Sequence, residues 1–154
     1  MKYKDYKEKR QAEINALPIF FAFSNEQFDK AMSERGLSSD NKEDLEKIAK
    51  IPGGGFCLKN DLPKIKECFE NDPLEKLMKG KIFAEEAFLY EMWNHEYAIN
   101  WQGDWDVCSV FYHCDYAEDK TWYDYLKENK VEDKIIQAFA NAKNRYMKKA
   151  QKYF

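Results

Sequence analysis

Both histidines of the chain lie in the stretch EMWNHEYAINWQGDWDVCSVFYH, which runs from Glu91 to His113 and also holds three of the four tryptophans. On a helix, a carboxylate four residues before an imidazole lies within hydrogen-bonding reach of it, which is the arrangement of a general acid–base pair. Glu91 and His95 have this spacing, and a thiol such as Cys57 would supply a nucleophile. These residue types predict a small hydrolase or transferase site around Glu91, His95 and Cys57.

The same residues are more typical of the end of a helix. Asn94 and His95 suit a helix C-terminus, where an imidazolium interacts favourably with the helix dipole. The alternating pattern over residues 95–101 predicts a strand after that helix, and neighbours in a strand, such as His95 and Glu96, point to opposite faces. We therefore favour a structural His95 and a protein that is not an enzyme, and keep the hydrolase or transferase site as an alternative.

Neither a metal nor a cofactor is expected. No two of the four cysteines, Cys57, Cys68, Cys108 and Cys114, have the C-x2-C spacing typical of structural zinc. The glycines at 53–55 precede a predicted strand, whereas a phosphate-binding loop follows a strand and opens a helix. The N-terminus lacks the apolar segment of a secretion signal, and no stretch approaches the roughly 20 apolar residues of a membrane span. We expect a cytoplasmic protein with reduced thiols.

Charge is distributed unevenly along the chain. Residues 1–10 carry five bases and two acids, residues 134–154 carry six bases and no acid, and the stretch between them carries 14 bases and 26 acids. Between Asp104 and Asp133, nine acids and three lysines lie among many aromatic residues. Tyr and Trp are enriched at interface hot spots, and a negative surface complements a basic partner. This pattern predicts a protein-binding surface formed by Trp105, Asp115, Tyr116, Glu118, Asp119, Trp122, Tyr123 and Asp124.

The basic C-terminal segment supports a further alternative. Bases interleaved with rings are typical of surfaces that bind nucleic acid, although lysines are also common on the solvent face of any terminal helix. The residues of this alternative are Lys143, Arg145, Lys148, Lys149 and Lys152.

Periodicity and capping signals predict the elements that position these residues. We expect short strands at 19–23, 56–59 and 95–101, and helices at 1–16, 24–36, around 45–49, 60–70, 74–80, 82–93, 122–129 and 131–152. Residues 107–114 fit either a helix capped by Asp106 or a fourth strand, and we favour the helix. In the helix at 82–93, Ile82 is expected to be buried and Glu91 to face water.

Together these elements predict an α+β fold, with a three- or four-stranded sheet covered by helices and a long amphipathic C-terminal helix packing across them. We expect a single domain over residues 1–154. It comprises a basic N-terminal helix (1–16), an α+β core (18–101), and an acidic aromatic segment followed by the basic terminal helix (102–154).

Three blocks, FFAFSNEQF (20–28), GGGF (53–56) and FLYEMWNHEYAINW (88–101), resemble a family of small uncharacterised proteins encoded by bacteriophages and other mobile elements of bacteria. The resemblance covers residues 18–101, so the N-terminal helix and the C-terminal region are departures from it. It implies a protein similar in kind to phage inhibitors of host defence, including anti-CRISPR proteins. We therefore expect an inhibitor that acts in the bacterial host cytoplasm, where its acidic aromatic surface occupies a nucleic-acid-handling face of a defence complex.

Overall fold

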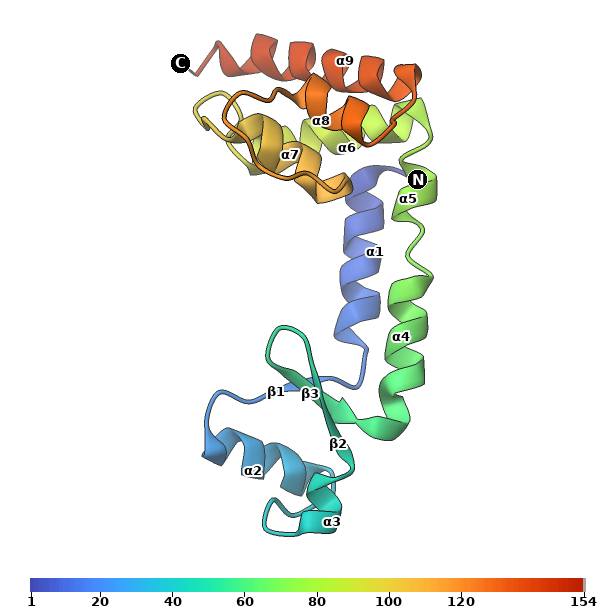
Figure 1. The fold of residues 1–154 in the computed structure, drawn as a ribbon, viewed down its shortest axis with the longest axis vertical. Helices are drawn as coiled ribbons and strands as arrows, with labels where there is room; N and C mark the ends of the chain where they lie inside the picture. Colours follow the sequence, from blue (N-terminus) through green and yellow to red (C-terminus); the bar gives the residue numbers. More distant parts are fainter. Residues whose placement is uncertain (154) are drawn as a thin grey trace. The chain divides into compact units, whose positions relative to one another are not determined.

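The computed structural model describes residues 1–153, which divide into two compact units (Figure 1). Unit 1 comprises residues 1–9 together with the chain from Pro73 onward, and unit 2 comprises residues 10–72. Helix α1 (Tyr3–Asn15) contributes residues to both units. The α+β class and the small sheet are confirmed, while the single-domain expectation stays a prediction. Within residues 1–153, every helix is too short or too polar to cross a membrane.

Unit 1 is helical and is organised around one pair of helices. It contains the start of α1 and helices α5 (Leu74–Leu77), α6 (Lys81–Asn94), α7 (Gly103–Phe111), α8 (Trp122–Glu128) and α9 (Asp133–Ala150). Helix α9 lies along α6 (Figure 1). Ala87 of α6 and Ala142 of α9 are fully buried, and Phe88 meets Phe139 with ring centroids 4.9 Å apart. The amphipathic terminal helix therefore packs on α6.

Unit 2 contains the sheet. Strands β1 (Phe20–Phe21), β2 (Ile48–Ile51) and β3 (Gly55–Leu58) pair antiparallel in the order β1-β3-β2. Helix α2 (Asn25–Glu34) sets Phe28 against the sheet ring Phe56, with centroids 5.3 Å apart. The remaining elements are α3 (Lys42–Leu45), a 3-10 turn (Lys59–Asp61) and α4 (Leu62–Glu70). A partly buried three-stranded sheet, with α2 packed on Phe56, thus forms the centre of this unit.

The start of α2 follows the predicted capping signal. The Ser24 hydroxyl accepts a hydrogen bond from the Gln27 backbone N–H at 3.2 Å. The Gln27 side chain accepts from the backbone N–H of Phe23, one residue before the cap, at 2.8 Å. Each side chain satisfies a backbone donor that the helix itself leaves unpaired. The predicted helix at 24–36 is confirmed, with bounds one or two residues shorter.

Two predicted elements are wrong. Residues 48 and 49 were expected in a helix but lie in β2, because IAKI pairs with β3 across a tight turn. Gly53 and Gly54 of this turn have φ of +89° and +82°, a conformation that glycine adopts without strain. Residues 95–101 form turns rather than a third strand, and Ile99 and Trp101, expected on a buried face, are 63% and 78% exposed.

The ambiguous segment at 107–114 is helical up to Phe111, as favoured, but α7 begins at Gly103 and not after Asp106. The orientation of α6 also differs from the prediction. Ile82 is 84% exposed, whereas Glu91 is 1% exposed. The helix therefore buries a charged residue that its sequence pattern assigned to water.

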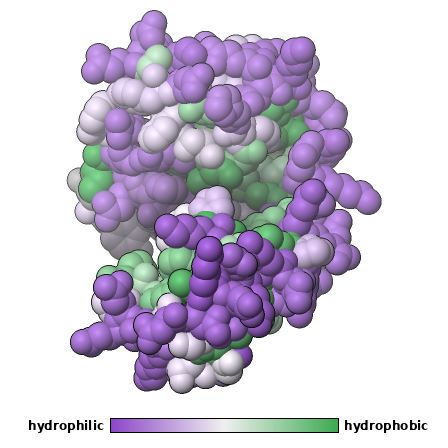
Figure 2. Space-filling model, turned by 60° about the horizontal axis from the view of Figure 1, so that its bottom comes forward, coloured by the Kyte–Doolittle hydropathy of each residue, from purple (hydrophilic) through white to green (hydrophobic). Residues whose placement is uncertain are grey.

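Hydrophilic residues dominate the face drawn in Figure 2, and hydrophobic residues gather there in limited patches. Single exposed apolar side chains such as Phe23 are ordinary on protein surfaces. On such a surface, a binding site is expected where exposed rings and charges meet in a hollow.

Candidate functional site

One such hollow lies on unit 1 beside α7 and the loop at residues 112–121, and has a volume of about 220 Å³. It is lined by the rings of Trp101, Trp105, Tyr116 and Tyr125. The Tyr116 ring meets both indoles edge-on, with centroids 6.0 Å from Trp101 and 5.7 Å from Trp105. We call this site the aromatic recess; its charged lining residues are Asp104, Glu118 and Lys120.

The three charged residues of the recess differ in whether they already form hydrogen bonds or ion pairs within the protein. The Asp104 carboxylate accepts hydrogen bonds from the Tyr97 hydroxyl and from the backbone N–H of Trp122. Lys120 pairs with Glu128 at 2.8 Å, which raises the pKa of its ammonium. Glu118 is exposed and makes no ion pair within residues 1–153. The charge that remains available to a ligand is therefore negative.

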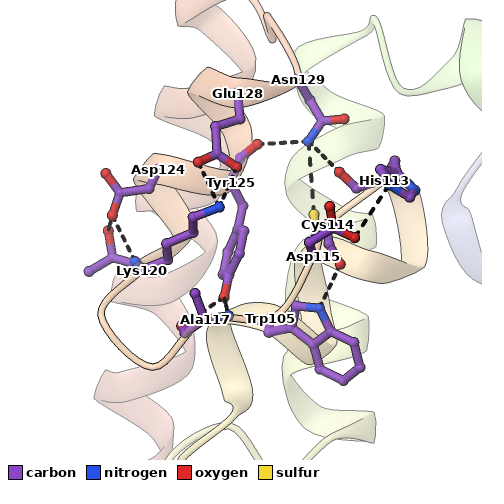
Figure 3. A network of polar contacts seen from close by, with 11 residues as sticks. Trp105, His113, Cys114, Asp115, Ala117, Lys120, Asp124, Tyr125, Glu128 and Asn129 are labelled. Carbon is purple, nitrogen blue, oxygen red and sulfur yellow. Dashed lines mark hydrogen bonds and ion pairs between the residues drawn. The ribbon is translucent and has the colours of Figure 1, made fainter.

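The first half of the loop at 112–121 is held by side chains from both neighbouring helices (Figure 3). The Trp105 indole N–H donates to the carbonyl of Cys114 at 2.8 Å. The Asn129 amide donates to the carbonyl of His113 at 2.9 Å. These bonds fix the two residues that precede Asp115, whose carboxylate stays 88% exposed and lies 3.5 Å from the His113 imidazole.

The second half of the loop is held from α8. The Tyr125 hydroxyl donates to the carbonyl of Ala117 and accepts from its N–H, at 3.2 and 3.3 Å (Figure 3). Asp124 accepts from the backbone N–H and the hydroxyl of Thr121, at 2.8 and 3.1 Å, and so caps α8. Between these anchors Glu118 and Asp119 point their charge at solvent. A loop without regular secondary structure is thus held in one conformation while it exposes three acids and a ring.

The predicted partner-binding residues divide into exposed residues at or near the recess and residues that pack or cap α8. Trp105, Tyr116 and Glu118 line the recess, and Asp115 and Asp119 are exposed on the same loop. Tyr123 is 47% exposed on α8. Trp122, in contrast, stacks on the core ring Phe139 with centroids 4.7 Å apart and planes 12° apart, and Asp124 forms the capping box of α8 with Thr121.

Sequence reasoning missed Trp101, which is the most exposed ring of the recess. The alternation of residues 95–101 placed it on a buried strand. The signal against that strand is Asn100, followed by Gly103, since Asn and Gly are typical turn residues. The Asn100 side chain does build this turn, accepting from the Gln102 N–H at 3.0 Å and donating to the carbonyl of His95 at 3.0 Å.

Glu91 and His95 are brought together, with 3.4 Å between the His95 Nε2 and a Glu91 carboxylate oxygen. The same carboxylate accepts from the Tyr3 hydroxyl at 2.7 Å, from the Lys7 ammonium at 3.1 Å and from the Asn94 amide at 3.0 Å. Burial raises the pKa of Glu91, but these hydrogen bonds outweigh it, so the pKa lies below its usual value. A carboxylate occupied in this way joins α1 to α6 and is a poor general base.

Cys57, the third residue of the enzyme alternative, lies in β3 of unit 2, so neither unit contains all three groups. The thiol is fully buried, and burial raises its pKa. A nucleophilic cysteine needs the opposite shift, toward the thiolate. Among residues 1–153, no cluster of His, Cys, Asp and Glu is suited to hold a metal ion.

The bases of the nucleic-acid alternative separate into two groups. Arg145 is clamped by Glu85 at 2.9 Å and Glu86 at 3.0 Å, and the Lys143 ammonium lies 5.8 Å from the Tyr97 ring centroid. Lys148 is exposed on α9. Lys149 and Lys152 line a second hollow of about 500 Å³ together with Trp93 and Tyr153. Trp93 carried no predicted role, because only the packing of α6 on α9 brings it beside these lysines.

Residues 2–108 match a family described as "Family of unknown function (DUF7659)". The matched range includes the N-terminal helix, which lies outside the resemblance of residues 18–101 to phage-encoded proteins. It ends within α7, before the loop at 112–121 and helices α8 and α9. None of the curated proteins and none of the solved structures matches the chain.

Proposed function

The chain belongs to the family of unknown function DUF7659, and we propose that it is a protein-binding inhibitor whose aromatic recess and acidic loop occupy a basic face of its partner. The observation that carries this proposal is the loop at 112–121, which bonds from α7 and α8 hold in place while Asp115, Tyr116, Glu118 and Asp119 remain exposed. A surface ordered before binding loses little conformational entropy on association.

The size and chemistry of the recess favour a protein side chain as its ligand. Its volume of about 220 Å³ lies below the range of about 300–1,000 Å³ typical of small-molecule sites. Two indoles and a phenol attract a cation over their faces, and the free carboxylate of Glu118 adds to this attraction. A guanidinium also stacks on aromatic rings, so an arginine of the partner suits the recess best.

A narrower form of the proposal concerns the partner. The resemblance of three sequence blocks to phage-encoded proteins supports a bacterial defence complex that handles nucleic acid, as an anti-CRISPR-like inhibitor would bind. Such complexes hold nucleic acid in basic grooves, and an acidic surface with exposed rings competes for the same arginines and lysines. In this form the protein acts in the cytoplasm of the bacterial host.

A labelled peptide with alternating arginine and glycine provides a direct test of the recess. We expect the wild-type protein to raise its fluorescence anisotropy at low ionic strength. The variant Trp101→Ala with Glu118→Gln should bind at least tenfold more weakly, because it removes the exposed indole and the free carboxylate while leaving the bonds that hold the loop. A citrulline peptide, which lacks the positive charge, should bind weakly to either protein.

The matched control is Asp29→Asn with Glu34→Gln on α2, which removes two exposed acids from unit 2. It should keep the wild-type affinity within about twofold, because neither acid lines the recess and the rings and the carboxylate of the recess stay in place. If the control and the recess variant lose the same peptide affinity, the loss is due to the change in net charge and not to the recess. If the recess variant binds the peptide as tightly as the wild-type protein does, the recess is not the binding site.

The inhibitor role is tested by expressing the protein in bacteria with an active CRISPR defence and counting plaques of a targeted phage. We expect the wild-type protein to raise the efficiency of plating. Trp101→Ala with Glu118→Gln should abolish this increase, whereas Asp29→Asn with Glu34→Gln should retain it. An increase that persists in the recess variant at equal protein levels contradicts the assignment of the inhibitory surface.

A further inference from the structure

We propose that the second hollow of unit 1 binds a nucleoside phosphate, with the phosphate between Lys149 and Lys152 and the base against the rings of Trp93 and Tyr153. We call this hollow the basic cleft. Its residues come from the end of α6 and from the end of α9 with the turn that follows it. The inference is independent of the proposed function, since the basic cleft shares no residue with the aromatic recess and has the opposite charge.

The two lysines are suited to a phosphate because they are adjacent and unpaired. Lys149 lies in the last turn of α9 and Lys152 in the turn that follows it, and both side chains line the same hollow, which brings their ammonium groups within reach of one ligand. Lys149 and Lys152 are exposed and make no ion pair within residues 1–153, unlike Arg145 on the same helix. None of the described residues that line the cleft is acidic.

The two rings are suited to a base because one is rigid and the other is accessible. Trp93 is 40% exposed, and its inner side rests against Tyr146 with centroids 4.5 Å apart. Tyr146 is itself buried, and its hydroxyl accepts from the Ala98 N–H at 3.0 Å, which holds the pair in place. Tyr153 is 77% exposed and provides a second aromatic face. Stacking on such faces recognises any base without selecting its sequence.

The volume of the basic cleft also separates it from the aromatic recess. At about 500 Å³ it falls within the range of about 300–1,000 Å³ found for small-molecule and cofactor sites. A nucleoside phosphate can be presented by a free nucleotide or by a segment of single-stranded nucleic acid. Both present a phosphate anion and a base ring to the protein.

The test measures binding of a labelled thymidine oligonucleotide by anisotropy, with ATP and inorganic pyrophosphate as competitors. We expect binding at about 50 mM salt that weakens steeply as salt rises. Lys149→Gln with Lys152→Gln should bind at least tenfold more weakly, and its salt slope should fall by about 0.7 for each lysine, the value for single strands. Tyr153→Ala should weaken binding severalfold, and its ring is too exposed for its loss to unfold the helix.

The control is Lys79→Gln with Lys81→Gln, two exposed lysines of unit 1 outside the cleft. It should stay within twofold of the wild-type affinity. Competition by ATP at least tenfold better than by pyrophosphate supports recognition of the base. A higher affinity for the oligonucleotide than for ATP then identifies single strands as the source, and equal affinity identifies free nucleotides.

Three results would overturn the proposal. They are the absence of binding by either ligand at 50 mM salt, an equal loss in the control pair, and competition by pyrophosphate as strong as by ATP. None of these results bears on the arginine peptide, whose binding depends on Trp101 and Glu118. The two sites can therefore fail separately.

Discussion

Trp122→Ala is expected to lower the free energy of unfolding of unit 1 by about 3 kcal/mol, the lower end of the usual cost of removing a large core ring. Trp122 is only partly buried, but its indole stacks flat on Phe139, a fully buried ring of α9. Truncation leaves a cavity that α8 and α9 cannot fill without moving closer together. Urea unfolding followed by circular dichroism and by the fluorescence of the remaining tryptophans, all of which lie in unit 1, measures the loss.

Trp101→Ala is the matched control, since it removes the same side chain from a position that is 78% exposed. It should change the free energy of unfolding by no more than about 0.5 kcal/mol, as is usual for surface substitutions. Only Trp101→Ala should weaken peptide binding while leaving stability unchanged. If both substitutions lower the free energy of unfolding equally, the assignment of Trp101 to binding and Trp122 to packing is wrong.

Glu91→Gln is expected to lower the free energy of unfolding of unit 1 by about 2–4 kcal/mol near pH 7, because hydrogen bonds to a buried charge are strong and Lys7 loses its partner. The substitution keeps the size of the side chain but removes the charge that accepts from Tyr3, Lys7 and Asn94. Glu86→Gln is the control on the same helix. Its carboxylate forms a half-exposed ion pair with Arg145, and such pairs contribute at most about 1 kcal/mol.

The effect of Glu91 also depends on pH in a defined direction. Because its pKa is lower in the folded protein, its stabilising contribution is fully present above the unfolded-state pKa of about 4.3 and is lost as the pH falls through the folded-state value. The difference in urea midpoint between the wild-type protein and Glu91→Gln should therefore shrink on acidification below about pH 4.3. A difference that stays constant from pH 7 to pH 3.5 would show that charge is not its cause.

Much of the secondary structure could be predicted because its signals are local. Ser24 and Gln27 define the start of α2, and the repeat of apolar residues along α9 defines both the helix and its buried face. The two wrong elements have a common physical reason. A strand is stable only when it pairs with another strand. Residues 48–51 form a strand because they pair with β3, whereas the alternating residues 95–101 have no partner strand and form turns.

The candidate sites likewise combine features that were predictable from the sequence with features that depend on tertiary contacts. Composition and charge indicated that an acidic aromatic segment and a basic helix were the parts to search, and five of the predicted partner-binding residues, Trp105, Asp115, Tyr116, Glu118 and Asp119, do lie at the recess or on its loop. Which rings face solvent was not predictable. Trp101 and Trp122 are the same residue type in the same segment, yet one is exposed and the other stacks on Phe139.

The sequence alone determined the α+β class, the capped and amphipathic helices, and the segregation of charge, since each depends on neighbours within a few turns of chain. Only the tertiary structure decided that Glu91 is buried against Tyr3 and Lys7, and that Trp93 lies beside Lys149 and Lys152. These contacts join residues more than 50 positions apart. They form because α6 packs against both α1 and α9, and no local pattern specifies which side chains such packing brings together.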